Sequence, residues 1–251
     1  MIEKHAVVTG GGTGIGSAIA NALADAGVKV TVMGRRPEPL ETVRAGRDNM
    51  QAVCCDVTDG DSVTRAFEQA TATFGVIQIL VNNAGAAPTA PFHKMAFEDW
   101  RQVMSLNLDG VFRCIQAVLP GMLEQGWGRV INIASTAAHK GYAYVSAYTA
   151  AKHGVLGLTR ALALETATKG ITVNAVCPGY TDTDIIRDSV KNIVAKTGRS
   201  EAEALAQFTG TNPQGRLIQP DEVAHAVLWL CNDLSASITG QALSVSGGEV
   251  M

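Results

Sequence analysis

Short apolar runs alternate with longer amphipathic stretches along almost the whole chain. Seven runs rich in β-branched residues are bounded by Gly, Asp or Asn, and they cover residues 6–9, 28–32, 51–55, 77–81, 130–134, 171–176 and 242–245. Runs of this length and composition are typical of buried strands. The stretches between them follow the period of a helix, for example at 14–26, 62–74 and 97–124.

This alternation predicts the fold class. Repeated β–α units place parallel strands side by side, with the connecting helices on both faces. Right-handed crossovers then give a doubly wound α/β Rossmann fold with a seven-stranded, mostly parallel sheet. Since no linker or repeat interrupts the pattern, residues 1–251 are interpreted as a single dinucleotide-binding and catalytic domain. The polar stretch 181–219 is expected to be either a substrate lid or plain surface helix and loop.

Composition narrows the class of protein. The 251 residues are 47% hydrophobic and 17% charged, with a net charge of −3, which is typical of a globular protein. The charges form no basic stripe, so neither nucleic acid nor a membrane is an expected partner. The first residues lack the apolar core of a signal peptide, and no apolar run approaches the ~20 residues of a membrane span.

The cysteines point to a reducing compartment. Their number is odd and their spacing fits neither a disulfide framework nor a metal site: Cys54, Cys55, Cys114, Cys177 and Cys231. We therefore expect small core residues of a cytoplasmic protein. The adjacent Cys54 and Cys55 should point to opposite faces of a strand.

A glycine-rich turn follows the first apolar run. It has the spacing Gly10-x-x-x-Gly14-x-Gly16 and leads into a helical pattern. Glycines let the backbone approach a pyrophosphate, and the helix N-terminus offers free N–H groups. A purely structural turn is the alternative, but the position after the first strand favours a dinucleotide site. We expect Gly10, Thr13, Gly14 and Ile15 to contact the cofactor.

The end of the second run favours NADP(H) over NAD(H). An NAD site would place a carboxylate there for the ribose 2′-hydroxyl, but the chain has Arg35 and Arg36 instead. Guanidinium groups bind a 2′-phosphate through charge-assisted hydrogen bonds. Two solvated surface arginines are the alternative, and NAD(H) stays possible.

Two further segments lie where a cofactor would pass the sheet. Asp56 and Val57 follow the third run and are candidates for the adenine edge, although Asp56 fits a turn equally well. Asn83, Ala84 and Gly85 follow the fourth run at the carboxyl edge, where open α/β sheets bind ligands. A plain turn is the alternative there.

Tyr148 and Lys152 are candidates for proton transfer. They lie four residues apart in a helical pattern over 147–167, so they share one helix face. A nearby ammonium favours phenolate and would lower the pKa of Tyr148 toward that of a general acid or base. An isolated pair of this kind is usually a solvated helix pair, so the interpretation depends on its neighbours.

Two more polar residues complete the candidate site. Ser135 ends the fifth run at the carboxyl edge, where a hydroxyl can stabilise the charge of a reacting carbonyl oxygen or simply form a turn. Asn107 falls in the middle of a helical pattern, where an amide is locally unfavourable. It predicts either a buried structural amide or the anchor of a water-linked proton path.

Taken together, these motifs resemble the short-chain dehydrogenase/reductase family over nearly the whole chain. The resemblance implies that Tyr148 transfers the substrate proton and that Lys152 lowers its pKa and binds the nicotinamide ribose. It also implies that Ser135 positions the carbonyl and that Asn107 anchors a relay water. The nicotinamide end would meet residues of a further segment: Pro178, Gly179 and Thr181.

Within the family, residues 129–136, 151–163 and 170–179 are similar to 3-oxoacyl reductases and polyketide-type ketoreductases. Two departures weaken the link to a carrier-protein substrate. Thr13 stands where many of those NADP-linked reductases have a basic residue, and Ala86-Ala87-Pro88 replaces a polar segment. Because the family usually forms tetramers, a homotetramer is expected.

The sequence therefore predicts an oxidoreductase that transfers a hydride between NADP(H) and a small-molecule ketone or secondary alcohol, on a 3-oxoacyl-type or related ketone. An NAD-linked secondary alcohol or 3-hydroxyacyl thioester dehydrogenase is the nearest alternative, and a catalytically silent dinucleotide sensor is the second. Specificity is expected to involve the loop 139–144. There Tyr142 and Tyr144 would either stack on the substrate or pack under the lid, and Lys140 is interpreted as solvated.

Overall fold

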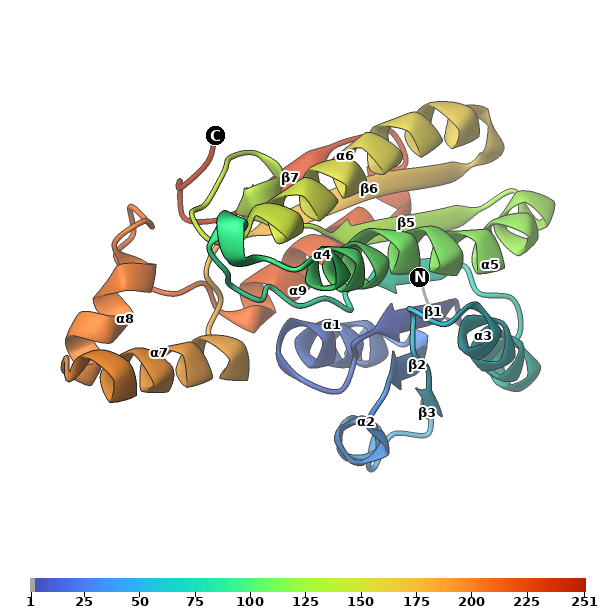
Figure 1. The fold of residues 1–251 in the computed structure, drawn as a ribbon. Coiled ribbons are helices and arrows are strands. Elements are labelled where there is room, and N and C mark those ends of the chain that lie inside the picture. Colours follow the sequence, from blue (N-terminus) through green and yellow to red (C-terminus); the bar gives the residue numbers. More distant parts are fainter. Residues whose placement is uncertain (1–2) are drawn as a thin grey trace.

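The computed structural model describes residues 3–251, in which seven strands form one sheet with the order β3-β2-β1-β4-β5-β6-β7 (Figure 1). The strands are β1 (His5–Thr9), β2 (Lys29–Gly34), β3 (Met50–Cys54), β4 (Ile79–Asn82), β5 (Gly128–Ile133), β6 (Ile171–Pro178) and β7 (Ala242–Val245). Every neighbouring pair is parallel. The predicted doubly wound α/β fold is confirmed, because the strand order reverses direction at β1 and β4.

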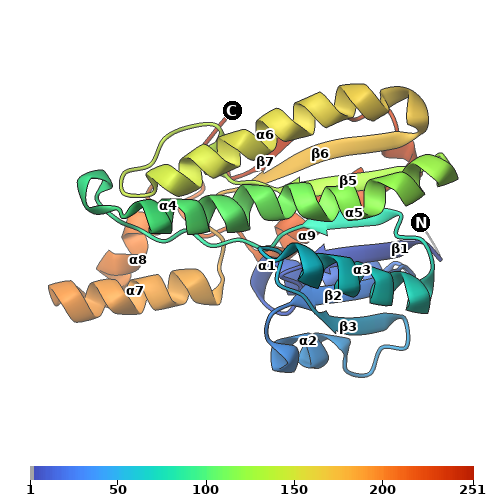
Figure 2. The ribbon, with the colours of Figure 1, turned by 45° about the vertical axis from the view of Figure 1, so that its right-hand side comes forward.

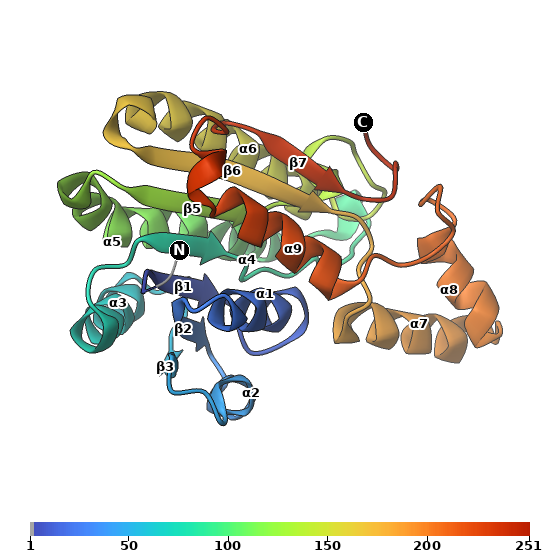
Figure 3. The same cartoon turned by 180° about the vertical axis from the view of Figure 1, so that it is seen from behind.

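Helices cover both faces of this sheet (Figures 1, 2 and 3). One face carries α1 (Gly14–Asp25), α2 (Pro37–Arg44) and α9 (Pro220–Leu230). The other carries α3 (Gly60–Phe74), α5 (Gly110–Gln125) and α6 (Ser146–Thr166). Single 3₁₀ turns lie at Phe92–Lys94, Thr136–Ala138, Ala167–Lys169 and Asp233–Ser235.

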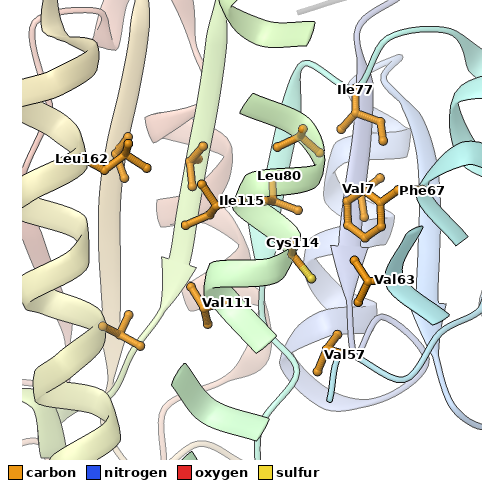
Figure 4. Close-up of a cluster of buried hydrophobic side chains, with 14 of the residues drawn as sticks. Val7, Val57, Val63, Phe67, Ile77, Leu80, Val111, Cys114, Ile115 and Leu162 are labelled. Carbon is orange, nitrogen blue, oxygen red and sulfur yellow. The ribbon is translucent and has the colours of Figure 1, made fainter. Parts of the chain in front are cut away.

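Burial on both faces explains why the strands are continuous apolar runs. Val7 and Leu80 join the hydrophobic cluster beneath α3, α5 and α6 (Figure 4). Their chain neighbours Val8 and Val81 join the cluster beneath α1 and α9. Adjacent strand residues point to opposite faces, so a strand covered on both sides has no polar face.

The long helical pattern at 97–124 is interrupted in the structure. It consists of α4 (Phe97–Met104), a π-helical turn (Ser105–Asp109) and α5. π-turns inside helices often occur at functional sites. This turn carries Asn107, which is fully buried.

The stretch 181–219 forms a helical excursion at the carboxyl end of the sheet. Its helices are α7 (Asp184–Thr197) and α8 (Glu201–Thr209), which project away from the sheet in Figures 1 and 2. A parallel bridge between Thr181 and Ile218 joins the two ends of the excursion. The bridge lies at the expected ends of this stretch, and its role as a substrate lid stays a prediction.

The five cysteines differ in burial. All five are free thiols, and Cys55 is buried while its neighbour Cys54 is exposed. The two do point apart, but the expectation that Cys54 is a core residue is wrong, because β3 is the edge strand and ends at that residue. In the described part of the chain, every helix is too short or too polar to cross a bilayer.

Candidate active site

A cavity of about 490 Å³ lies along the carboxyl ends of the strands. The predicted cofactor residues all line it: Gly10, Thr13, Gly14, Ile15, Arg35, Arg36, Asp56, Val57, Asn83, Ala84, Gly85, Tyr148, Lys152, Pro178, Gly179 and Thr181. Ser135 lines it as well, whereas Asn107 is buried behind its wall. Residues predicted from separate segments therefore share one site.

The glycine turn fits a pyrophosphate because its backbone is free of side chains and can approach a ligand closely. A Cβ atom at two of its glycines would also clash with neighbouring atoms. Gly10 has a φ of +64°, and a Cβ on it would lie 2.9 Å from the Asn83 amide nitrogen. A Cβ on Gly16 would collide with the Gly10 carbonyl oxygen. The Asn83 amide donates to the carbonyl oxygens of Thr9 at 3.0 Å and Gly10 at 3.1 Å. The turn is thus held close to the N-terminus of α1, where N–H groups and the helix dipole favour an anion.

Arg35 and Arg36 leave the end of β2 as exposed side chains on the cavity. Among residues 3–251, neither has a carboxylate within ion-pair distance. Two unpaired guanidinium groups at the end of β2 match the chemistry of a 2′-phosphate.

Asp56 forms the turn that the sequence left as an alternative. Its carboxylate accepts hydrogen bonds from the backbone N–H and the hydroxyl of Thr58, at 2.9 Å and 2.7 Å. Burial acts to raise the pKa of Asp56, but the Thr58 hydrogen bonds and the positive charge of Arg35 lower it overall. Asp56 is therefore an anion fixed in a turn on the cavity wall, and its contact with an adenine stays a prediction.

Asn107 is paired with backbone groups on two sides. Its amide nitrogen donates to the carbonyl oxygens of Val103 and Ala86, each at 3.0 Å, and its oxygen accepts from the Ala86 N–H at 3.3 Å. A Cβ on Gly85 would lie 2.7 Å from that oxygen and 3.7 Å from Lys152 Nζ. Asn107 thereby fixes the loop after β4 next to Lys152, and both of its N–H donors are used.

Tyr148 and Ser135 meet at the opposite end of the cavity from the arginines. Ser135 precedes the 3₁₀ turn after β5, and its hydroxyl accepts from the Ala137 N–H at 3.1 Å. Burial raises the pKa of Tyr148, and hydrogen bonding with Ser135 opposes that shift only in part. The direction is opposite to the lowered pKa that the Tyr-Lys spacing predicts, because desolvation of the phenolate dominates.

Lys152 is a buried cation. Its side chain is on α6, the residue is 3% exposed, and Nζ donates to the Ile133 carbonyl oxygen at 2.8 Å. Desolvation lowers the pKa of Lys152 to about 8. The ammonium lies 5.6 Å from the centre of the Tyr148 ring, within the reach of a cation–π interaction.

The loop 139–144 is held by a residue whose importance the sequence did not reveal, Glu249. Tyr142 lines the cavity and also packs edge-on against Tyr180, the residue just before the excursion, while stacking on the substrate stays a prediction. Lys140 is not a free solvated lysine, because its Nζ lies 3.0 Å from Glu249. Glu249 is two residues from the chain end, where a charged residue gives no sequence signal of burial.

The model of the short chain dehydrogenase family matches residues 4–193. The chain belongs to this family. The match covers the glycine turn, Ser135, Tyr148 and Lys152, all of which line the cavity.

Relatives within the family extend over the whole chain. An acetoacetyl-CoA reductase of Rhizobium meliloti is 39% identical over 248 residues, covering 99% of each protein. A cis-4-hydroxycyclohexanecarboxylate dehydrogenase of Sinomonas cyclohexanicum is 39% identical over 250 residues, covering 98% of this chain and 96% of the relative. The crystal structure of a variant of actinorhodin polyketide ketoreductase with NADPH superposes with a TM-score of 0.93, at 40% identity, covering 98% of this chain and 97% of that one.

Proposed function

We propose that this chain is an NADPH-dependent ketoreductase that acts on a 3-oxoacyl-type or related ketone. The observation that carries the proposal is one cavity with two unpaired arginines at one end and a protonated phenol beside a serine at the other. The acetoacetyl-CoA reductase and the ketoreductase with NADPH support this direction and this cofactor.

The cofactor would be held by the chain's own backbone and charges. The α1 N-terminus and the glycine turn bind the pyrophosphate, and Arg35 and Arg36 bind the 2′-phosphate. Bound NADPH supplies a hydride to the carbonyl carbon of the substrate.

The proton comes from the protein. As the carbonyl π bond breaks, the oxygen gains negative charge, and the Ser135 hydroxyl donates a hydrogen bond to it. Tyr148 transfers its phenolic proton to that oxygen, which yields the secondary alcohol. The raised pKa of Tyr148 keeps the phenol protonated at neutral pH, as a general acid requires. Lys152 then stabilises the phenolate, which regains a proton from bulk solvent through the water relay expected near Asn107.

The dehydrogenase among the relatives supports a second candidate, an NAD(P)-linked oxidation of a secondary alcohol at the same site. In that direction Tyr148 would have to accept the proton of the alcohol, which only its phenolate form can do. Because the pKa of Tyr148 is raised, the phenolate is a minor form at neutral pH, which favours reduction over oxidation. Relative turnover of ketone and alcohol at neutral pH separates the two directions.

Exposed apolar side chains and free thiols support the expected assembly and location. Phe112 on α5 and Leu164 on α6 are large apolar residues that are 48% and 82% exposed. Such positions support the homotetramer expected from the family. Free thiols throughout support a cytoplasmic protein.

The test is oxidation of NADPH and NADH by purified protein across a ketone panel that includes acetoacetyl-CoA and bulky aromatic ketones. We expect turnover with NADPH, lost by about 10²–10⁴-fold in Tyr148→Phe. Tyr180→Phe is the matched comparison and should lose far less. NADPH binding without turnover of any ketone would contradict the proposal and favour the sensor.

A further inference from the structure

Glu249 is a buried carboxylate that contacts two residues of the loop that borders the active site. Its side chain is 1% exposed, although it is close to the C-terminus. One carboxylate oxygen accepts from the Tyr142 phenol at 2.5 Å and lies 3.0 Å from Lys140 Nζ. The other oxygen lies 3.1 Å from where a Cβ on Gly179 would be, so the carboxylate also packs against the chain after β6.

The proton positions around this carboxylate follow from its chemistry. The Glu249 carboxylate can only accept, so the phenol of Tyr142 must donate its single proton to Glu249. The Thr136 hydroxyl, 2.7 Å from the same phenol oxygen, must then be the donor in the other hydrogen bond. Burial, followed by the bond to Glu249, raises the pKa of Tyr142. The Tyr142 hydroxyl therefore donates one hydrogen bond and accepts another, and the aromatic ring is the part of the side chain that faces the cavity.

Tyr142 is the first member of an aromatic row. Its ring lies 6.2 Å from that of Tyr180 at 73°, and the Tyr180 ring lies 5.1 Å from that of Phe208 at 77°. In such edge-to-face contacts each ring stabilises the orientation of its neighbour. The row therefore links the active-site loop to α8.

The same row connects two cavities. Tyr142 lines the main cavity, Phe208 lines a second cavity of about 430 Å³, and Tyr180 lines both. Among the described residues, the lining of the second cavity carries no charged side chain: Thr89, Ala90, Pro91, Ala143, Tyr144, Tyr180, Ile193, Gln207 and Phe208. It is suited to an apolar group that extends from a carbonyl held at Ser135 and Tyr148.

We infer that Glu249 is a positioning residue that fixes Tyr142 and, through it, the aromatic row on which the bulky apolar part of the ketone binds. This inference rests on the proposed function and narrows its substrate class to ketones with a large apolar group beyond the carbonyl. Among the described residues, the hydrogen bond and ion pair of Glu249 go to Tyr142 and Lys140 and not to Ser135 or Tyr148, so its effect is on substrate selection.

The test compares a two-ring ketone, 1-tetralone, with a small one, ethyl acetoacetate. Glu249→Ala removes the anchor, Tyr142→Phe removes only its hydrogen bonds, and Glu249→Gln keeps an oxygen that can accept from Tyr142. Val250→Ala is the matched control, since it alters the same tail without removing the carboxylate. Thermal melting checks that each variant is folded.

We expect Glu249→Ala to lower kcat/KM for 1-tetralone about tenfold more than for ethyl acetoacetate, mainly through KM, because one hydrogen bond to a charged group is lost. Glu249→Gln should recover most of that selectivity and Val250→Ala should keep it. The double variant of Glu249→Ala with Tyr142→Phe should lose no more than the worse single variant, because both act through one contact.

A second readout does not depend on turnover. Calorimetry of 1-tetralone binding in the presence of NADP⁺ should show a Kd raised by a similar factor in Glu249→Ala. If binding depends on Glu249 but no ketone is reduced, the proposed function fails and this inference stands. If the KM ratio and the Kd are both unchanged in Glu249→Ala and in Tyr142→Phe, the inference is overturned whatever the activity.

Discussion

Lys152 Nζ lies 5.6 Å from the centre of the Tyr148 ring and donates to the Ile133 carbonyl oxygen at 2.8 Å. One turn of α6 separates the two residues, yet the ammonium is directed at the end of β5. Lys152 is buried beside Tyr148, whose raised pKa is dominated by desolvation and not by the charge of Lys152. The cost of this placement is visible in Lys152 itself, whose pKa falls to about 8.

Replacing Lys152 should therefore stabilise the protein while removing activity. Lys152→Met keeps an unbranched apolar chain and removes a buried cation, so we expect the free energy of unfolding to rise by about 1–2 kcal/mol when no cofactor is added. Ketone reduction should fall steeply in the same variant. Melting temperature and turnover measure the two effects, with the exposed Lys169→Met as control.

The pH dependence provides an independent check on Lys152. Between pH 8 and 10.5 the unfolded chain holds a proton that the folded chain has released, so Lys152 makes the wild type more stable as pH rises through that window. Lys152→Met should lack this contribution. Parallel stability curves for the two proteins over pH 8–10 would contradict the buried-cation account.

The preference for NADPH is expected to depend on Arg35 and Arg36. Replacing either by Ala removes charge-assisted hydrogen bonds to the 2′-phosphate, which should raise KM for NADPH by about 10–100-fold. KM for NADH should change little. Arg44→Ala is a suitable control, because this α2 arginine is paired with Glu41 at 2.8 Å. An equal rise in KM for NADPH and NADH would show that the arginines do not bind the 2′-phosphate.

The glycine turn should tolerate no methyl group at residue 16. In Gly16→Ala the Cβ would meet the Gly10 carbonyl oxygen, so the turn must shift. We expect a loss of about 1–3 kcal/mol in stability and weaker NADPH binding, measured by melting and by titration. Gly157→Ala on α6 is the matched control, because its Cβ meets no described atom within 4 Å. That substitution should leave stability unchanged or raise it.

His5 should make stability depend on pH below neutrality. It is 1% exposed; Nδ1 must donate to the Gly75 carbonyl at 2.8 Å, and the neutral Nε2 accepts from the Thr31 hydroxyl at 2.8 Å. Burial lowers the pKa of His5 below 6.5. As pH falls through 6.5 the unfolded chain takes up a proton that the folded chain does not, so stability declines.

The measurement is the free energy of unfolding from pH 7.5 to 5.5 in the wild type and in His5→Gln. The variant cannot titrate at this position, so its decline should be shallower. His225→Gln, at an exposed position on α9, should keep the slope of the wild type. A slope unchanged in His5→Gln would mean that His5 takes up its proton equally in the folded and unfolded chains, which would contradict the lowered pKa.

Local patterns were sufficient for the fold and for the residues that line the cavity. Seven apolar runs became seven strands because each is buried on both faces, which leaves a continuous signal in the sequence. The glycine turn and the Tyr148–Lys152 spacing are equally local. Parallel strands end at one edge of the sheet, so motifs at their carboxyl ends had to meet.

Features that depend on packing were not determined locally. The π-turn at Asn107 arises where its amide bonds to Ala86, and the direction of the Tyr148 pKa arises from burial that no spacing reveals. Cys54 is exposed because β3 is an edge strand.

The sequence by itself determined a doubly wound sheet with a nucleotide turn, a pair of arginines and a tyrosine–lysine pair at one edge, because each is set by residues near one another in the chain. Only the tertiary structure decided that Glu249 meets Tyr142 from 107 residues away and that a row of aromatic rings joins two cavities. Contacts between distant segments depend on how helices and loops pack at the sheet edge. A charged residue near a chain end has no sequence pattern around it that predicts its burial.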